Sequence, residues 1–368
     1  MQSSDVFVVG GGPAGLGAAI ALRLKGYSVK VADCAVPPVE KACGEGLMPD
    51  SQAALRKLGV VVPSAHGFPF RGVRLIEGHT TVQGDFPDGV GLGVRRPVLQ
   101  QLLIQRAEQL GVELQWGITG IDLRAEGLFV RKKRVDADLI VAADGHKSLL
   151  RRRAGLEAAR RLSFRYGFRR HYRVAPWSEY MESYWGDGFQ IYVTPVAPDE
   201  VCVVLMSSHA GFRLDNALAL APAVSRRLEG HPYSSNEMGA LTVSRKLKRV
   251  CKPGFALVGD ASGSVDAITG EGLCLSFKAA LALADAYAAG DLTLYQRAHE
   301  RFQVNPSRMA SLLLLLGRHP RLRRRVLAAF ACRPDVFSRL LAIHVGASSF
   351  HEFKPNQILS FSREFLFA

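Results

Sequence analysis

The first 33 residues change periodicity twice. Residues 6–9 (VFVV) form a continuous apolar run, which is typical of a buried strand. Residues 14–25 then repeat apolar positions at helical spacing, and residues 28–33 (SVKVAD) predict a second strand. Strand, helix and strand in this order predict the start of a parallel α/β sheet.

The same α/β pattern continues in later segments. The spacing of Leu99, Leu103 and Ala107 predicts a helix over 97–111, which stops at Gly111. Further strands are predicted at 112–116, 138–144 and 255–260, and further helices at 51–58 and 272–289.

Residues 163–206 have a different character. Aromatic and β-branched residues dominate short runs that are separated by turn signals, which predicts a separate antiparallel sheet. Residues 296–346 are almost wholly helical in pattern, with breaks near Pro306, Pro320 and Pro334.

We therefore predict an α/β fold with a Rossmann-type dinucleotide-binding domain, an inserted antiparallel β-sheet substrate domain and C-terminal helices. The dinucleotide domain is discontinuous and the two domains interleave. The predicted boundaries are 1–71, 94–160 and 250–300 for the dinucleotide domain, 72–93 and 161–249 for the substrate domain, and 301–368 for the helical segment.

Composition narrows the class of protein. The chain has 368 residues, which is long enough for two packed domains. Its net charge of +14 favours anionic partners such as nucleotide cofactors.

The six cysteines form no CxxC pair, so we predict neither a metal site nor disulfides. This usage of cysteine predicts a reducing, cytoplasmic location. No apolar run approaches the roughly 20 residues that cross a bilayer, and the N-terminus lacks a signal-peptide pattern.

The N-terminal turn carries a GxGxxG fingerprint between the first strand and helix. The first glycine permits a tight turn, the second allows a pyrophosphate to approach the backbone, and the third lets helix and strand pack closely. Asp33 ends the second strand, where a carboxylate would bind a ribose diol. The predicted dinucleotide contacts here are Gly10, Gly12, Pro13, Ala14, Gly15 and Asp33.

Two later segments carry further motifs, ADLIVAADGHKSLLRR at 137–152 and GFALVGDASGSVDAITGEGLCLSFKAA at 254–280. With the first fingerprint, they resemble in order and spacing the flavoprotein superfamily of aromatic hydroxylases, geranylgeranyl reductases and flavin-dependent halogenases. The resemblance implies FAD as the cofactor and NADPH or NADH as the reductant. The matching motif residues are Asp144, Gly145, Ser148, Arg151, Gly259, Asp260, Gly270, Glu271 and Gly272.

The resemblance also shows departures. Arg96 matches an Arg that lies near FAD in the superfamily, but Gln100 stands where that segment usually has Asp. Asp33 stands where Glu is more common. From the residues alone, Asp260 would accept hydrogen bonds from the ribitol, and a helix opening at Gly272 would stabilise negative charge on the reduced flavin.

The segment KACGEGLMP at 41–49 is closest in motif to the geranylgeranyl reductase-like branch, where a Cys-Gly-x-Gly loop lies by the isoalloxazine. Gly44 is therefore a predicted cofactor contact. Cys43, Glu45 and Glu271 are the candidate catalytic residues, as proton donors or acid–base groups. The alternatives are a small buried cysteine and solvated or Arg-paired carboxylates.

The aromatic residues of the predicted antiparallel sheet either fill a core or line an apolar pocket over the flavin. We predict Tyr184, Trp185, Tyr192 and Pro195 as the pocket. Lipid-reducing relatives carry Tyr-x-Trp-x-Phe-Pro in this region, and the chain has QIYVTP at 190–195 instead.

The function predicted from these observations is an NAD(P)H-driven monooxygenase of a hydrophobic aromatic, quinone or polyketide-like substrate. The first alternative is a geranylgeranyl reductase-like enzyme that reduces C=C bonds of an isoprenoid or lipid, and the second is a non-catalytic flavin-binding docking protein. Arg318, Arg321, Arg323, Arg324 and Arg325 form either a solvated face or a contact with an anionic membrane surface or acidic carrier protein. No nucleic-acid module is recognised.

Overall fold

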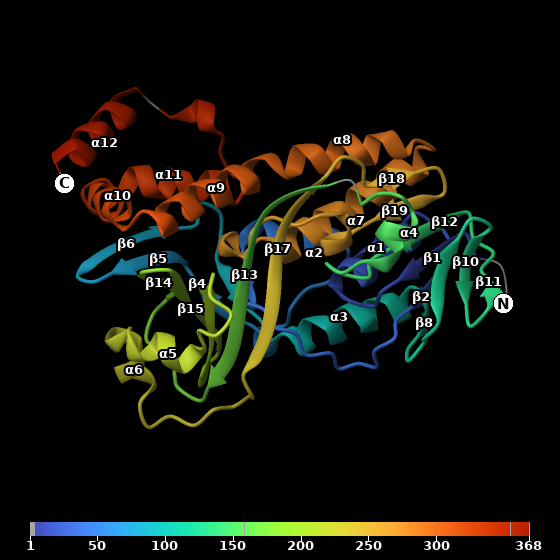
Figure 1. The fold of residues 1–368 in the computed structure, drawn as a ribbon, viewed down its shortest axis with the longest axis horizontal. Coiled ribbons are helices and arrows are strands. Elements are labelled where there is room, and N and C mark those ends of the chain that lie inside the picture. Colours follow the sequence, from blue (N-terminus) through green and yellow to red (C-terminus); the bar gives the residue numbers. More distant parts are fainter. Residues whose placement is uncertain (1–3, 158, 354, 368) are drawn as a thin grey trace.

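The computed structural model describes residues 4–157, 159–353 and 355–367. Two large β-sheets lie along the long axis of the molecule, one beneath helices of residues 272–302 and one beneath the C-terminal helices that follow them (Figure 1). Two long strands, β13 (Ala159–Tyr172) and β17 (Met238–Leu247), reach from the second sheet toward the first. The predicted α/β fold with an antiparallel insertion is confirmed.

The first sheet has six strands in the order β18-β19-β12-β1-β2-β8. Its members come from distant parts of the chain, and all pairings except β18–β19 are parallel. The strands are β1 (Val6–Val9), β2 (Val29–Ala32), β8 (Glu113–Gln115), β12 (Leu139–Ala142), β18 (Cys251–Lys252) and β19 (Phe255–Leu257).

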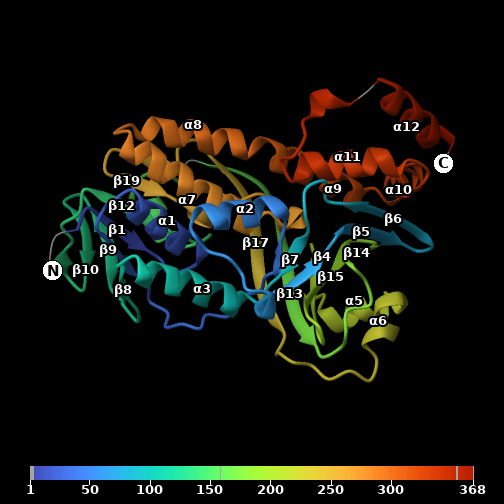
Figure 2. The ribbon, with the colours of Figure 1, turned by 180° about the vertical axis from the view of Figure 1, so that it is seen from behind.

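Helices α1 (Pro13–Leu24), α3 (Arg96–Gln109) and α7 (Gly272–Ala288) pack around this sheet. Their apolar side chains join the strands in one buried cluster, which explains why β1 is apolar on both faces. Figure 2 shows α3 on one side of the sheet and α2 (Pro49–Lys57) beside α7 on the other. A small sheet of β9 (Ile121–Arg124), β10 (Gly127–Val130) and β11 (Lys133–Arg134) lies at this end of the molecule.

The second sheet has seven strands in the order β17-β13-β16-β15-β14-β5-β6. Only β14 and β5 pair in parallel. The other strands are β5 (Gly72–Glu77), β6 (Thr80–Asp85), β14 (Tyr180–Gly186), β15 (Phe189–Ala197) and β16 (Glu200–Ser207). Helices α5 (Leu214–Ala219) and α6 (Pro222–Leu228) cover one face with their apolar side chains.

A third sheet joins the other two. Its order is β3-β7-β4, with β3 (Gly46–Leu47), β7 (Gly91–Gly93) and β4 (Phe68–Phe70). Because β3 follows the cysteine segment directly, this pairing fixes the segment between the two large sheets.

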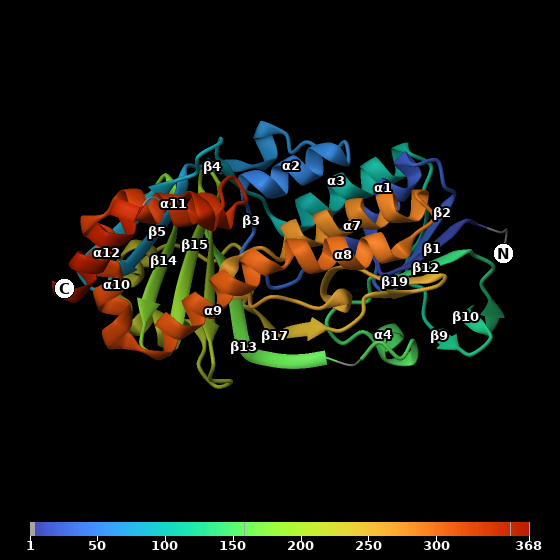
Figure 3. The ribbon, with the colours of Figure 1, turned by 90° about the horizontal axis from the view of Figure 1, so that it is seen from above.

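The C-terminal helices form a layer over the second sheet, as Figure 3 shows from above. The breaks predicted near Pro320 and Pro334 are confirmed, since α10 and α11 begin at these residues, where proline occupies the first helical turn. Pro306 lies within the first turn of α9, and the break before that helix is at Gln303. The layer contains α9 (Val304–Arg318), α10 (Pro320–Cys332), α11 (Pro334–His344) and α12 (Pro355–Phe367). The preceding helix, α8 (Leu292–Phe302), packs against α7 at the first sheet instead. Among the described residues, no helix has the length and hydropathy needed to span a bilayer.

Candidate active site

The GxGxxG turn lies between β1 and α1, with three glycines in three different environments. A Cβ on Gly10 would lie 2.4 Å from the Ala143 oxygen, and one on Gly15 would lie 1.8 Å from the Gly10 oxygen. These two positions therefore need glycine for close packing. A Cβ on Gly12 would meet no heavy atom within 4 Å, so this glycine borders open space at the start of α1.

Asp33 and Gln100 hold this turn in place. Asp33 accepts hydrogen bonds from the Gly11 and Ala35 backbone N–H groups. Gln100 donates to the Gly11 oxygen at 3.3 Å and accepts from Val39 N at 2.8 Å. Gln100 therefore connects the phosphate-type turn to the segment before the cysteine loop, a contact for which its amide is suited because it both donates and accepts.

The Asp-Gly and Gly-Asp motifs are connected by a buried arginine. Arg151, only 1% exposed, donates to Glu157 at 2.7 Å, to the Ala261 oxygen at 3.1 Å and to the His146 oxygen at 3.0 Å. The Asp144 carboxylate accepts from the Ser148 hydroxyl and from Leu150 N. The charged groups of Arg151 and Asp144 thus find their partners within the protein. The backbone of the motif glycines, rather than these side chains, is therefore available to contact a ligand.

The Gly-Asp motif ends in a left-handed turn. Gly259 has φ +61° and lies so close to α1 that a Cβ there would be 2.5 Å from the Ala14 Cβ. Asp260 forms an ion pair with Lys41 at 3.4 Å. Gly270 has φ +70° and redirects the chain, so that α7 begins at Gly272 with its N-terminal amides directed outward.

Glu271 lies in this turn and is 3% exposed. Burial raises its pKa to about 8, and the nearby charge of Asp50 adds to the shift. Its Oε2 has no hydrogen-bond partner among the described residues and lies 3.5 Å from His344 Nδ1. His344 comes from α11 and donates through Nε2 to the Thr269 oxygen, at 3.1 Å. Burial lowers the pKa of His344, so this imidazole is neutral.

The cysteine loop is organised by Glu45, which is fully enclosed and has φ +59°. Its Oε1 accepts from Arg96 N at 2.9 Å and its Oε2 accepts from His171 Nε2 at 2.7 Å. Arg169 donates to His171 Nδ1 at 2.9 Å, which fixes the proton of the imidazole on Nε2. The strained backbone of Glu45 is thus held by two elements at once.

Cys43 lies beside this anchor. Its Sγ accepts from Glu45 N at 3.4 Å, and its carbonyl accepts from Cys202 Sγ at 3.6 Å. The side chain of Cys43 is half-buried, and the neighbouring Gly44 borders open space, since a Cβ there would meet no heavy atom within 4 Å. The loop therefore presents a thiol next to bare backbone.

Comparison with known proteins identifies the class of enzyme. Residues 3–168 match the family described as "FAD binding domain". The menaquinone reductase of Mycobacterium tuberculosis (strain H37Rv) is 28% identical over 301 residues, covering 74% of this chain and 73% of the relative. These similarities identify an FAD-dependent oxidoreductase enzyme.

Two further similarities complete the comparison. An FAD-dependent monooxygenase of Beauveria bassiana is 33% identical over 155 residues, which cover 38% of this flavoenzyme and 36% of the relative. The structure of a geranylgeranyl bacteriochlorophyll reductase-like protein from Thermoplasma acidophilum superposes with a TM-score of 0.71 at 22% identity, covering 98% and 96% of the two chains. The resemblance to the hydroxylase and reductase superfamily is confirmed.

The residues of this flavoenzyme fit FAD. Gly12, Gly44 and Gly272 belong to three separate segments, none of them has a positive φ, and a Cβ on any of them would enter open space. Neither backbone conformation nor packing within the described residues explains these glycines. A ligand that passes close to bare backbone does, as a diphosphate and a planar ring would.

The predicted pocket residues of the flavoenzyme separate onto the two faces of the second sheet. Tyr184 lies in the apolar cluster under α5 and α6, whereas Trp185 and Tyr192 pack on the opposite face with Ile268 and α9. The Tyr192 hydroxyl donates to the Ile268 oxygen at 3.4 Å, next to the Glu271 turn. Buried Pro195 contributes its carbonyl to the contact with Gly93. Strand alternation explains the separation, since neighbouring residues point to opposite faces.

Sequence reasoning missed His171 and His344. They contact the predicted residues Glu45 and Glu271, respectively, from distant positions in the sequence. The available signals were the polar residues at alternate positions of β13, including Arg169 and His171, and a lone histidine ending the apolar segment of α11. Sequence reasoning also missed the packing of Cys202 beside Glu45 and His171, whose ligand-type atoms all lie within 4.8 Å of one another.

The predicted arginine surface needs one correction. Arg323 is buried and binds Glu77 of β5 at 2.7 Å and Asp187 at 3.0 Å. It therefore belongs to the packing of α10 against the second sheet. Arg318, Arg321, Arg324 and Arg325 are exposed.

Proposed function

We propose that this flavoenzyme is an NAD(P)H-dependent reductase that saturates a carbon–carbon double bond of an apolar substrate of the isoprenoid or prenylated-quinone class. The observation that carries the proposal is the buried Glu271, whose pKa of about 8 keeps its carboxyl protonated at neutral pH. The similarity to the mycobacterial reductase supports it, since that similarity extends over three quarters of the chain. The match to the Beauveria monooxygenase covers 38%.

FAD would be held by backbone at Gly12, Gly44 and Gly272, with Asp33 and Asp260 as the predicted ribose and ribitol acceptors. When bound, it takes a hydride from reduced nicotinamide and supplies two electrons to an acceptor. The sequence contains a single GxGxxG fingerprint, which supports transient binding of NADPH or NADH at the surface.

The proton is the part of the reaction that the protein itself must supply. Saturating a double bond requires one proton at carbon, and a group with a pKa near the working pH is suited to deliver it. Glu271 holds such a proton, and the unprotonated Nδ1 of the neutral His344 lies 3.5 Å away as an acceptor that orients it. The Cys43 thiol is the second candidate donor. Glu45 has both carboxylate oxygens engaged, so we assign it a positioning role for the loop.

Monooxygenation is the second candidate function. The departure of residues 190–195 from the lipid-reductase pattern favours it, as does the identity of 33% with the Beauveria monooxygenase over the matched part. In that case Glu271 and Cys43 would have no proton to deliver to carbon.

The exposed arginines of α9 and α10 support the predicted contact with an anionic surface. Arg318, Arg321, Arg324 and Arg325 lie close in sequence to the exposed Leu312 and Leu315. This combination suits a membrane surface that contains the apolar substrate better than an acidic carrier protein, because a carrier would not require exposed leucines.

Anaerobic reoxidation separates the two functions. The enzyme is reduced with NADPH and mixed with geranylgeraniol under argon, and the flavin absorbance is followed. A reductase regains its absorbance and yields a saturated product. Reoxidation that requires O2, with labelled oxygen found in a product, would establish monooxygenation instead.

Cys43→Ala tests the thiol in the same assay. We expect the rate of alkene-dependent reoxidation to fall about 100-fold if Cys43 gives the proton, in the range typical of general acids. The exposed Cys34 provides the control, and Cys34→Ala should keep the full rate. Unchanged turnover of Cys43→Ala would leave Glu271 as the donor.

A further inference from the structure

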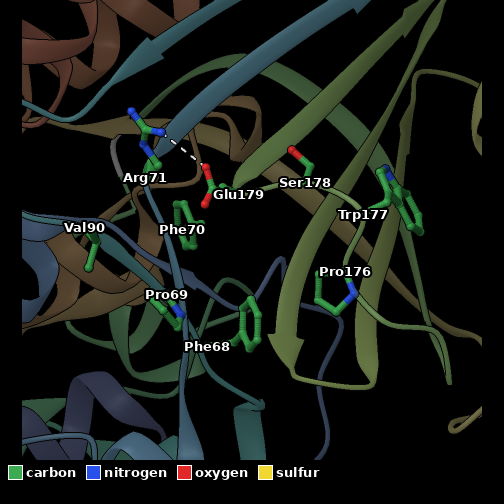
Figure 4. A pocket seen from close by; sticks show the side chains of 9 residues that line it. All are labelled: Phe68, Pro69, Phe70, Arg71, Val90, Pro176, Trp177, Ser178 and Glu179. Carbon is green, nitrogen blue, oxygen red and sulfur yellow. Dashed lines mark hydrogen bonds and ion pairs between the residues drawn. The ribbon is translucent and has the colours of Figure 1, made fainter.

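A pocket of about 540 Å³ opens on the substrate domain where β4 meets the segment before β14. In Figure 4 the β4 side chains form one wall, and Pro176 and Trp177 form the opposite wall. The volume lies within the range of small-molecule sites in proteins. The lining residues are Phe68, Pro69, Phe70, Arg71, Val90, Pro176, Trp177, Ser178 and Glu179.

The chemistry of the lining selects an uncharged, apolar ligand. Arg71 and Glu179 are the charged lining residues, and they pair with each other at 3.2 Å. Arg71 also binds Asp85 at 2.6 Å. Because these charges are neutralised at the rim, an anionic or cationic ligand would have to break existing ion pairs. Aromatic rings, prolines and Val90 provide most of the remaining wall.

Phe70 connects the pocket to the cysteine loop. The residue lines the pocket, yet it is only 1% exposed. Its ring lies 3.6 Å from the position of a Cβ on Gly46, which directly follows Glu45. Met181 and Thr194 of the second sheet border the same position at 3.7 and 3.8 Å. A single side chain therefore lies between the pocket and the loop that carries Cys43.

The apolar cluster around Phe70 extends to the turn that carries Glu271. Phe70 packs in one cluster with Met48, Leu341 and Val345. Met48 Cε lies 3.7 Å from the position of a Cβ on Gly270, and Val345 directly follows His344. The cluster thus spans the distance from the pocket to the proposed proton donor.

We propose that this pocket binds the apolar tail of the enzyme's own substrate, with the Phe70 ring as a gate through which the chain reaches Cys43 and Glu271. The inference rests on the proposed function for the identity of the occupant, an alkyl or isoprenoid chain. Binding of the chain in the pocket does not depend on turnover, so it can be measured separately.

Fluorescence quenching tests occupancy directly. A dodecanol chain with two bromine atoms quenches tryptophans that it touches, and Trp177 lies in the pocket wall. We expect saturable quenching in the holoenzyme that Trp177→Phe loses and Trp116→Phe retains. Equal quenching in Trp177→Phe would overturn the proposal. Quenching by brominated phospholipid vesicles without quenching by the free chain would also overturn it and identify a membrane contact.

A blocking substitution tests the connection to the reaction. Val90 is 43% exposed at the pocket, so Val90→Trp should fill the opening without disturbing the core, and Val61→Trp at the 69% exposed Val61 is the matched control. Each buried methylene strengthens binding about fourfold. We therefore expect Val90→Trp, by excluding about three methylenes from the pocket, to raise the KM for geranylgeraniol on the order of 50-fold. The KM for the shorter geraniol should stay unchanged.

The outcomes distinguish this inference from the proposed function. Equal effects of Val90→Trp on both alcohols would overturn the tail site while leaving the reductase in place. If neither alcohol reoxidises the unsubstituted enzyme under argon, the proposed function fails. The quenching result then still decides whether the pocket binds an apolar chain.

Discussion

Glu271 shows how a single buried group couples folding to pH. In the unfolded chain its carboxyl ionises near the ordinary value of 4.5, whereas burial raises the pKa to about 8 in the folded protein. Between these values the folded state binds a proton that the unfolded state has released. The contribution of this group to the free energy of unfolding therefore falls as the pH rises from 4.5 to about 8. Below pH 4.5 both states are protonated and the contribution is constant.

Glu271→Gln removes this titration while keeping the size of the side chain. We expect the variant to have a free energy of unfolding on the order of 3–5 kcal/mol above that of the original protein at pH 9, and an equal value near pH 4.5. Guanidinium unfolding at pH 4.5, 7 and 9 measures this difference. Glu126→Gln, at an exposed position, is the control and should show no trend. A difference that does not change with pH would contradict the raised pKa.

At the same scale, the sequence grouped Cys43, Glu45 and Glu271 as equivalent candidates. Their separation into a thiol beside open backbone, an anchored carboxylate and a buried acid depends on His171 and His344. His171 lies 126 positions from Glu45 along the chain, and His344 lies 73 positions from Glu271. No local pattern encodes such contacts, so the candidate residues could be predicted but their individual environments could not.

Among the elements, α7 begins with a glycine that the helix itself does not require. Gly272 occupies its first turn without a positive φ and without a packing neighbour. Alanine is the better helix former, by about 1 kcal/mol in a helix interior and less at an end. Glycine at this position is therefore unfavourable for the helix alone, and the proposed contact with FAD would explain its use.

Gly272→Ala is expected to weaken FAD binding at least about tenfold, which corresponds to about 1.4 kcal/mol of lost contact, and to leave the apoprotein equally or more stable. Titration of FAD fluorescence and thermal unfolding of the apoprotein measure the two effects. Gly211→Ala is matched to it, because a Cβ on Gly211 also meets nothing within 4 Å and this residue lies outside the three motifs. Should both variants bind FAD equally well, the assignment of the open backbone to the cofactor fails.

The elements themselves were largely predictable. The β1–α1–β2 unit and the helix over 97–111 follow from apolar periodicity and from glycine or proline at their ends. The short strands β3, β4 and β7 escaped individual prediction, because two or three residues carry no periodicity and these strands form only through pairing between distant segments.

Across the whole molecule, the C-terminal layer depends on an ion pair that the sequence could not distinguish from its neighbours. Arg323 is one of three consecutive arginines, yet it alone of the three is buried, and it binds Glu77 with two hydrogen bonds of 2.9 and 2.7 Å. Removing one partner of a buried pair leaves the other charge without compensation.

Arg323→Ala is therefore expected to lower the free energy of unfolding by about 3–5 kcal/mol. Arg324→Ala, one residue along the same helix and exposed, should change it by less than about 0.5 kcal/mol. Denaturant unfolding of both variants provides the comparison. Equal stability of the two would mean that the helical layer does not depend on this contact.

The hydrogen bond between Glu45 and His171 has a consequence for engineering. Consider a chimera that grafts onto this nucleotide-binding part an antiparallel sheet whose matching strand has no imidazole at the position of His171. In such a chimera the buried Glu45 carboxylate would lack its hydrogen bond from His171, and the left-handed backbone of Glu45 would lose one of its two restraints. Exchange of specificity by sheet grafting thus requires transfer of both members of the pair, even though they belong to different halves of the enzyme.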